Sequence, residues 1–519
     1  MKPEVTVTSA KLRSTLKKMS KSGDRFSVVL VMFSGEGPNS PQCKAVDEIT
    51  DGLLTRRVEH DGFDPRYKQS KIIDTDLSYE GLDKIILLGL GQRSKLTADG
   101  LRGVLAEAFV EARDTAHAEH LIFPLIDVDC LRNFSVEQFA QVVAEYAILA
   151  DYEPNHQKTR PWLDEAEQTH LKSLTLVSHR NTLRAAKAGA ELGVKIGEAT
   201  CMARSLVNEP SSTMTPSRLA KVAMKLASDS EGVVSCKVFS KQEIKKMKMG
   251  GLLAVNQGSK NPPTFIELSY DPAGGATQEC VVLVGKGVTF DTGGLNAKDY
   301  ESMADMKMDM AGSATVIAVM SLMPIIKPRM SVRALVAATD NDISDRSMRQ
   351  GDVLTTMSGL TVEVGHTDAE GRLTLADAIH YAQEHLEATM IIDLATLTGA
   401  VEDALGAYVT GVFGNNERFT RKFIKASRDA GEAMHELPMP EIYRAENKGK
   451  MADLTNDGGG PGAIAAAWFL REFVGEGVEW VHADIAATAF RTDATASGIE
   501  SIGGTGVGVR TLARFLADI

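Results

Sequence analysis

Short apolar runs alternate with segments of helical period along the first part of this chain, and this alternation limits the folds open to it. The runs at 26–33 and 83–89 have the length and composition of buried strands. The segments at 101–113 and 136–149 carry apolar residues at helical spacing. Strands that alternate with helices favour an α/β domain with a largely parallel sheet, which we predict for residues 1–180.

The remainder of the chain is long enough for a second domain, since 519 residues exceed one ordinary core. Residues 150–180 are polar and include Pro154 and Pro161, so we place the domain boundary there. Apolar residues then recur at steps of three and four, which predicts a connecting helix over 181–207. Beyond it, short apolar runs again alternate with helical segments, so we predict a larger α/β domain over 208–519.

Composition excludes several classes of protein. The net charge of −12 argues against general binding to nucleic acid or anionic membranes, although it does not exclude a local basic patch. The five cysteines are scattered and form no CxxC pair, which favours a reducing compartment and a cytoplasmic location. No stretch approaches 18 apolar residues, so we expect no membrane span. The basic N-terminus lacks a signal-peptide core and leaves a transit peptide or an amphipathic first helix as alternatives.

Common catalytic signatures are missing. The chain has 11 histidines but no HExxH, and it has no GxSxG elbow. The glycines at 89 and 91 follow a strand, but Ser94 stands where a dinucleotide fingerprint has its third glycine. The glycines around Lys286 lack the spacing of a phosphate-binding loop. Zinc proteases of the HExxH type, serine hydrolases of the GxSxG type and the common nucleotide-binding classes are therefore disfavoured.

The first cluster of charged residues lies in residues 282–312. An apolar strand over 280–284 leads into a glycine-rich segment that contains Lys286 and Asp291. We expect these two side chains in glycine-rich turns at the end of the strand, where α/β enzymes hold reactive groups. Lys298 and Asp309 follow in the same segment. For Lys286 taken alone, an ordinary surface lysine is the competing interpretation.

The second cluster is the alternating series Asp368, Glu370 and Arg372. In an extended chain, residues two apart point to the same side, so the two carboxylates would repel each other unless a cation compensates them. Arg372 is one candidate cation and a bound metal is another. A pair of metals about 3.5–4 Å apart needs a bridging carboxylate and several terminal ones, which these residues with Asp291 and Asp309 can supply. A solvated turn is the alternative interpretation.

The two clusters resemble the signatures of the leucyl aminopeptidase family, also called cytosol aminopeptidases. Residues 366–373 read HTDAEGRL, where the family has NTDAEGRL, and residues 284–294 read VGKGVTFDTGG. Lys298 and the MKMDM segment at 306–310 also match. Further matches lie at 208–220, 351–364, 393–400, 461–474 and 480–490. The resemblance is strong over 190–519 and loose before that. It implies a variable N-terminal α/β domain and a catalytic α/β domain with a mixed central sheet flanked by helices.

The resemblance also implies a two-metal site. Lys286, Asp291, Asp309 and Glu370 would hold one divalent ion, and Asp291, Asp368 and Glu370 would hold the other. The metals would be zinc or manganese, with cobalt or magnesium possible in an exchangeable site. A lysine ligand must be neutral, and two nearby cations together with burial would lower its pKa enough.

The implied reaction is the release of the N-terminal residue, leucine-like by preference, from peptides with a free N-terminus. A metal-bridging hydroxide would attack, Lys298 would stabilise the oxyanion, and a bicarbonate held by Arg372 would act as the base. The substrate would contact Met306, Asp309, Thr396 and Gly399, although ordinary core packing is an alternative for the pocket positions.

The family resemblance implies a homohexamer. A DNA-binding role and an inactive scaffold are the alternative functions; the acidic charge disfavours the first and the intact charged residues disfavour the second. His366 departs from the family's asparagine, which leaves its effect on substrate preference open.

Overall fold

The structure is a computed structural model that describes residues 2–79, 81–131, 134–154, 170–492, 499–500 and 502–519. Its contacts divide the chain into two compact units, one comprising Met1–Glu198 and the other Ala199–Thr492 with Ile502–Ile519. Most of the segment in which we placed the domain boundary, 155–169, lies outside the described residues. The exact boundary therefore stays a prediction.

The N-terminal unit contains a six-stranded sheet in the order β1-β6-β5-β2-β4-β3. Its pairings are parallel except for the edge pair of β3 and β4, so the expectation of a largely parallel sheet is confirmed. All eight residues of β2 are buried, as expected of a strand covered on both faces. The strands are β1 Glu4–Thr8, β2 Phe26–Phe33, β3 Ser70–Tyr79, β4 Leu82–Gly91, β5 His120–Pro124 and β6 Ser173–Val177.

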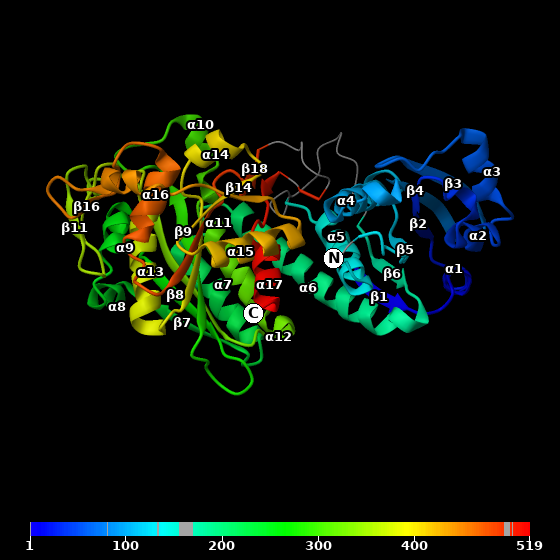
Figure 1. Ribbon diagram of the computed structural model, residues 1–519, viewed down its shortest axis with the longest axis horizontal. Coiled ribbons are helices and arrows are strands. Elements are labelled where there is room, and N and C mark those ends of the chain that lie inside the picture. The colour runs from blue at the N-terminus through cyan, green and yellow to red at the C-terminus, as the bar shows by residue number, and fades with distance from the viewer. Residues whose placement is uncertain (1, 80, 132–133, 155–169, 493–498, 501) are drawn as a thin grey trace. The chain divides into compact units, whose positions relative to one another are not determined.

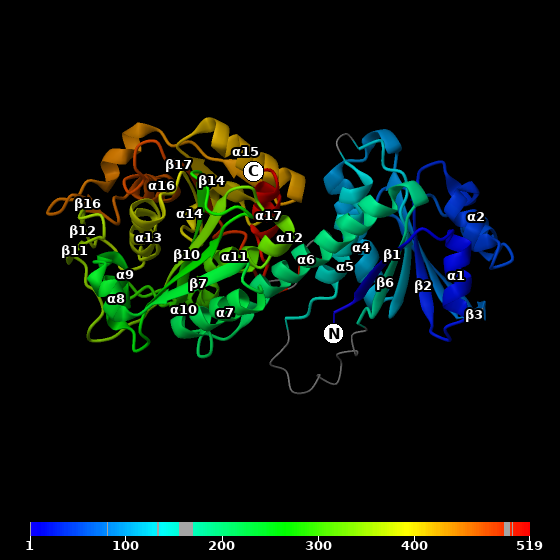
Figure 2. The same cartoon turned by 90° about the horizontal axis from the view of Figure 1, so that it is seen from below.

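Helices cover both faces of this sheet (Figure 2). Helices α1 Leu12–Ser20, α2 Pro41–Asp47 and α3 Leu53–Asp61 pack on one face, and α4 Ala98–Asp114 and α5 Val136–Ala150 cover the other. The long predicted helix is present as α6 Leu183–Asn208. Its Gly189 lies so close to α5 that a Cβ there would be 1.9 Å from the carbonyl oxygen of Glu137. Glycine at this position therefore permits the close approach of the two helices.

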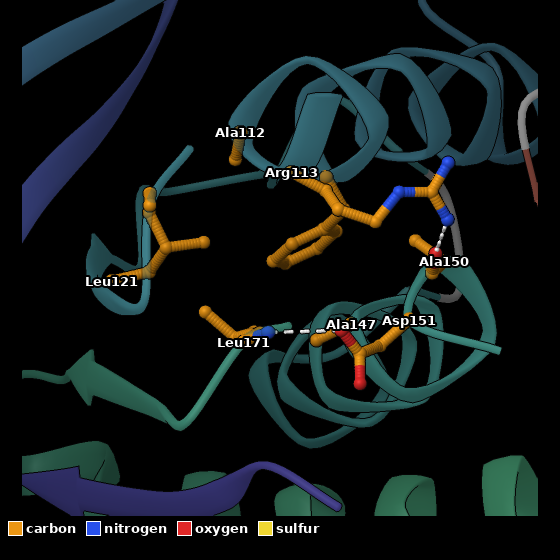
Figure 3. Close-up of a pocket in the computed structure, with 9 residues that line it drawn as sticks. Ala112, Arg113, Leu121, Ala147, Ala150, Asp151 and Leu171 are labelled. Atoms are coloured by element: carbon orange, nitrogen blue, oxygen red, sulfur yellow. Dashed lines mark hydrogen bonds between the residues drawn. The ribbon is translucent and has the colours of Figure 1, made fainter. Parts of the chain in front are cut away.

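A small cavity lies between α4, α5 and β5 (Figure 3). Its volume is about 10 Å³, and Phe109, Leu121 and Leu171 contribute apolar surface to its lining. The Asp151 carboxylate beside it accepts a hydrogen bond from the backbone N–H of Leu171 at 2.9 Å. A space of this size accommodates about one water molecule, so it is too small for a peptide substrate.

The second unit contains an eight-stranded mixed sheet in the order β15-β14-β17-β13-β9-β10-β8-β7. Strand β9 pairs in parallel with both β10 and β13, whereas β7, β8 and β14 introduce antiparallel pairs. The strands are β7 Val234–Phe239, β8 Thr264–Tyr270, β9 Cys280–Asp291, β10 Ser331–Asn341, β13 Met390–Ala395, β14 Thr410–Gly414, β15 Met434–Glu436 and β17 Glu479–Asp484.

Helices cover both faces of this sheet as well (Figure 1). One face carries α9 Gly250–Val255, α13 Gly371–Leu386 and α16 Gly462–Arg471, and the other carries α7 Pro216–Asp229, α11 Ala311–Met320, α15 Glu417–Ala430 and α17 Val509–Ala517. Every residue of α11 is buried. None of the helices within the described ranges is long and apolar enough to cross a membrane.

Short elements complete this unit. A small sheet joins β11 Val353–Thr355, β12 Thr361–Glu363 and β16 Leu454–Thr455, and β18 Phe490–Arg491 pairs with β19 Gly503–Gly504. The remaining helices of the unit are α8 Lys241–Lys246, α10 Tyr300–Ala304, α12 Met323–Ile326 and α14 Ala400–Leu405. These elements lie between the main strands and helices along the chain.

Candidate metal centre

Strand β9 continues through the glycine-rich segment instead of ending before it. We expected Lys286 in a turn after residue 284, but the structure places it inside β9 with its side chain buried. Gly285 and Gly287 keep their ladder positions opposite β10. A Cβ on Gly285 would lie 2.6 Å from the carbonyl oxygen of Gly312 at the start of α11. Gly285 therefore permits the close packing of α11 on the strand, whereas a Cβ on Gly287 would meet Val336 of β10 at 2.7 Å. The expectation of a turn at Lys286 was wrong.

The second motif is also not extended. A turn at 366–369 is closed by the backbone N–H of Ala369, which donates to the carbonyl of His366 at 3.3 Å. Glu370 immediately precedes α13, and Arg372 lies in the first turn of that helix. The backbone N–H of Leu373 already donates to the carbonyl of Glu370 at 3.0 Å. The helix forms from this point because its apolar residues must reach the core at helical spacing. The alternation argument therefore does not apply, although Asp368 and Glu370 still lie in one site.

Two lysines, Lys286 fully buried and Lys298 partly buried, bring the two motifs together. The Nζ of Lys286 lies 2.7 Å from Oδ1 of Asp309 and 2.9 Å from Oε1 of Glu370. It also donates to the carbonyl oxygen of Thr396 at 2.8 Å. The Nζ of Lys298 lies 2.9 Å from Oδ2 of Asp291 and 2.5 Å from Oδ1 of Asp368. Six of the seven charged residues that we singled out in the two motifs, all but Arg372, thus form one cluster.

The acidic part of the cluster has the geometry of a cation site. Asp291, Asp309 and Glu370 each offer a carboxylate oxygen within 4.8 Å of the others. Oδ2 of Asp309 and Oε2 of Glu370 are buried without a hydrogen-bond partner. Buried carboxylate oxygens are normally paired or coordinate a metal, so these atoms fit hard divalent ions.

The net charge of the cluster also indicates a cation site. The four carboxylates Asp291, Asp309, Asp368 and Glu370 face two ammonium groups, which leaves two negative charges without a partner. Burial opposes ionisation and raises the pKa of Asp309 to about 8, of Glu370 to about 7 and of Asp368 to about 6. Neighbouring carboxylates add to each of these shifts. At neutral pH the cluster therefore needs either protons or further cations.

The lysines respond in the opposite sense. Burial favours their neutral form, but the surrounding carboxylates outweigh it and raise the pKa of both Lys286 and Lys298. Asp309 is the largest electrostatic contributor at Lys286, and Asp291 is the largest at Lys298. With these partners alone, both lysines are cations.

Arg372 is a buried cation of a different kind. Its side chain lies beside α16, where the guanidinium carbon is 6.0 Å from the centre of the Phe469 ring. Burial lowers its pKa, and Asp457, Glu370 and Asp484 only partly oppose that shift. Its Nε atom is buried without a hydrogen-bond partner. An unsatisfied, planar donor fits a small planar anion.

The residues expected to contact substrate lie on segments beside the carboxylates. Met306 lies in the short helix Met306–Met308 that directly precedes Asp309. Thr396 follows β13 and donates its hydroxyl to Oδ1 of Asp309 at 2.7 Å. Gly399 precedes α14, and a Cβ there would meet no atom within 4 Å. Gly399 is exposed, so the space beside it is open to solvent.

Two residues that were not predicted from the sequence join the two motifs by hydrogen bonds. The Nδ2 of Asn341 donates to Oδ1 of Asp291 at 2.8 Å and to the carbonyl of Thr367 at 3.1 Å. The hydroxyl of Thr367 donates to the carbonyl of Gly293 at 2.6 Å. The available signal for Asn341 was the apolar run before it, which forms β10, the strand that Asn341 ends. Thr367 lies in the second motif, but only the charged residues of that motif were assigned roles.

Comparison with known protein families matches both units. Residues 201–513 match the model of the cytosol aminopeptidase family, catalytic domain, and residues 28–161 match the model of the same family's N-terminal domain. The first match alone spans more than half of the chain. The family resemblance is thereby confirmed for both domains.

Individual relatives in sequence and in structure support the same family assignment. Probable cytosol aminopeptidases of Alkaliphilus oremlandii and Aquifex aeolicus are each 36% identical to this chain, and each alignment covers 94% of it and 95% of the relative. A solved structure of the bottromycin maturation enzyme BotP in complex with Mn superposes with a TM-score of 0.81 at 31% identity, covering 95% of this chain and 99% of that one. A tomato leucine aminopeptidase mutant gives 0.82 at 31% identity, covering 100% and 97%. This chain belongs to the cytosol, or leucyl, aminopeptidase family of metallo-exopeptidases, with both of the family's domains.

Proposed function

We propose that this aminopeptidase uses two divalent ions to release N-terminal residues, leucine-like by preference, from peptides with a free N-terminus. The observation that carries the proposal is the buried cluster of Asp291, Asp309 and Glu370, which has two unpartnered carboxylate oxygens. With Asp368 included, four carboxylates face the two ammonium groups of Lys286 and Lys298, which leaves two negative charges in excess. Asp368 and Lys286 extend this cluster on either side. Surplus buried negative charge is what a pair of divalent ions would neutralise.

The residues divide into two ligand sets. Lys286, Asp291, Asp309 and Glu370 would hold one ion, and Asp291, Glu370 and Asp368 would hold the other, with the backbone carbonyl of Asp368 as a further ligand. As a metal ligand, Lys286 would have to be neutral. Its pKa is raised by carboxylates whose charge the ions would neutralise, so bound metal would lower that pKa and allow the proton to leave. Zinc or manganese fits this donor set, with cobalt or magnesium in a more exchangeable site. When bound, the two ions would activate water and polarise the scissile carbonyl.

Lys298 would act on the oxyanion. The carboxylates of Asp291 and Asp368 raise its pKa, so it stays a cation near neutral pH. A fixed ammonium beside the reacting carbonyl stabilises negative charge that develops on the oxygen. Asp309 lies on the other side of the cluster and would contact the free α-amine of the substrate. A blocked N-terminus would lose that contact, which accounts for exopeptidase specificity.

Arg372 would hold the base. Its buried, unpartnered Nε supports binding of a planar anion, and bicarbonate is the anion that we propose. The bicarbonate would accept the proton from water, since none of the described side chains in the cluster is free for that role. Met306, Thr396 and Gly399 would line the pocket for the first side chain of the substrate.

The assembly and location are part of the same proposal. We infer a homohexamer, for which mass photometry is the direct test, and a cytoplasmic location, which the five free cysteines support. Peptides are the proposed partners, and nucleic acid is not.

The proposal is tested with leucine p-nitroanilide, leucine amide and a panel of dipeptides, together with metal analysis of the purified protein. We expect two divalent ions per chain, hydrolysis of the free substrates and no hydrolysis of N-acetylated leucine amide. Asp291→Ala would lose both metal and activity. If metal-loaded protein leaves every substrate in the panel intact, the proposal is wrong.

A further inference from the structure

Asn456 is a fully buried asparagine that lies beside the second motif. It directly follows β16, whose two residues pair in parallel with β12. Its backbone N–H continues this pairing by donating to the carbonyl of Glu363 at 3.1 Å. The chain that leaves β12 is the 365–369 loop, which carries Asp368 and leads into Glu370 and Arg372. The short strand β16 therefore places Asn456 against this loop.

The amide of Asn456 bonds only to backbone atoms of that loop. Its Oδ1 accepts from the N–H groups of Gly365 at 2.7 Å and of His366 at 3.2 Å. Its Nδ2 donates to the carbonyl of His366 at 2.8 Å and of Ala369 at 3.1 Å. An asparagine amide has two donors and an oxygen with two lone pairs, so its whole capacity is used. The four partners lie on both sides of Asp368 in the chain.

The orientation of this amide is determined by its partners. Turning it over would direct its N–H groups at two N–H groups and its oxygen at two carbonyl oxygens. Aspartate at this position would keep the two accepting contacts and lose both donating ones. It would also bring negative charge against two carbonyl oxygens. Neither a turned amide nor a carboxylate can therefore replace the native contacts.

We infer that Asn456 is a positioning residue for the metal centre, because it fixes the backbone that presents Asp368 and Glu370. This inference rests on the proposed metal site. Groups that orient metal ligands from behind typically change metal affinity or activity by about 10–100-fold when they are replaced. Loosening of the loop should act on metal binding and kcat more than on KM, since Met306, Thr396 and Gly399 lie on other segments.

The test compares Asn456→Asp with Asn447→Asp. Asn447 is a matched control, because it is also buried and uses its Nδ2 on a backbone carbonyl, that of Ala465 in α16, at 2.8 Å. Each variant is titrated with Mn²⁺ and assayed with leucine p-nitroanilide. We expect Asn456→Asp to lose about 10–100-fold in Mn²⁺ affinity. Its kcat should recover partly at high Mn²⁺ and its KM should stay within about twofold, whereas Asn447→Asp should keep wild-type affinity. Asn456→Ser is measured by the same criteria without added charge.

Hydrogen exchange separates this inference from the metal proposal. Peptides covering 364–370 are followed in chelated and in Mn²⁺-loaded protein. We expect faster exchange in this segment for both Asn456 variants under both conditions, and unchanged exchange for Asn447→Asp. Unchanged exchange in the Asn456 variants, or an equal loss of Mn²⁺ affinity in Asn447→Asp, would overturn the inference. Wild-type protein that binds no Mn²⁺ while the exchange difference persists would overturn the proposed function instead.

Discussion

The Nζ of Lys286 lies 2.7 Å from Oδ1 of Asp309, and both side chains are 4% exposed. A pair this deeply buried gains little stability over an apolar contact, because both charges lose their hydration. Removing one partner, however, leaves the other as an isolated buried charge. The same Nζ also contacts Glu370, so two carboxylates depend on one ammonium. This dependence makes Lys286 the most informative position to change.

Lys286→Met should destabilise the metal-free protein by about 3–5 kcal/mol, since it leaves buried carboxylates unpaired. Metal should restore part of this loss, because divalent ions would then neutralise the same carboxylates. Metal affinity should fall by more than about 100-fold, since outer groups alone cost about 10–100-fold. Urea unfolding with and without Mn²⁺ measures both effects. A variant as stable and as active as wild type would contradict the role of Lys286.

Chelation should inactivate the enzyme and lower its Tm. A ligand present at about 100 times its Kd stabilises the folded state by about 2.7 kcal/mol, and each ion adds a contribution of this kind. Mn²⁺, Zn²⁺ or Co²⁺ should restore both activity and Tm. Calorimetry and leucine p-nitroanilide assays on the same samples provide the measurement. Full activity after exhaustive chelation would be incompatible with the metal centre.

The metal-free protein should become less stable as the pH rises from about 4 to about 8. The carboxyl pKa values of Asp368, Glu370 and Asp309 are raised to about 6, 7 and 8 in the folded state. Unfolded carboxyls titrate near their ordinary values of about 4. Between these limits the folded state binds more protons than the unfolded state, so the free energy of unfolding falls with rising pH.

Bound metal should reverse this trend, because coordination requires ionised carboxylates and its stabilisation therefore grows with pH. Urea unfolding between pH 5 and pH 9, with chelator or with Mn²⁺, measures the two slopes. Slopes of the same sign would count against the pKa assignments.

Gly371→Ala should weaken metal binding although it replaces no proposed ligand. A Cβ at this first residue of α13 would lie 2.5 Å from Cε and 2.8 Å from Nζ of Lys286. The lysine side chain must then shift away from Asp309 and Glu370. We expect about a 10–100-fold loss of metal affinity, comparable with other changes behind a metal ligand. Isothermal titration with Mn²⁺ measures it, and wild-type affinity would show that Lys286 adjusts freely.

Gly399→Ala should leave stability and metal binding unchanged, since its Cβ would meet no atom within 4 Å. If Gly399 lines the substrate pocket, the added methyl should raise KM for leucine substrates more than for alanine substrates. One methyl group in such a pocket changes specificity by about 10–200-fold. Equal KM changes for both substrates would place Gly399 outside the pocket.

Much of the fold followed from sequence because the relevant signals are local. The apolar run 26–33 coincides with β2 from end to end, and the helical segment predicted over 136–149 lies within α5. Buried strands and helices leave such patterns wherever they pack against a core. The mixed sheet came from the family resemblance, since strand order depends on contacts between distant segments.

The site was predicted only in part. The charged residues were identifiable because all seven lie in two short segments of the sequence. The glycines around Lys286 were misread as turn residues, since a glycine that admits a helix and one that makes a turn look alike in sequence. Asn341 and Asn456 escaped notice, because an asparagine after a strand is typical of ordinary loops. Their importance comes from partners that are far apart in the chain, such as Asp291 and the 365–369 loop.

The position of Lys286 within β9 affects the rate of ion uptake. Strand β9 has parallel neighbours on both sides, β10 and β13, and Lys286 itself pairs with Ala337 of β10. The cage should therefore keep its shape when its ions leave. Reloading should be limited by dehydration and entry of the ion, with no slow step of chain reorganisation. Stopped-flow mixing of chelated enzyme with Mn²⁺ should show a single phase whose rate rises in proportion to ion concentration.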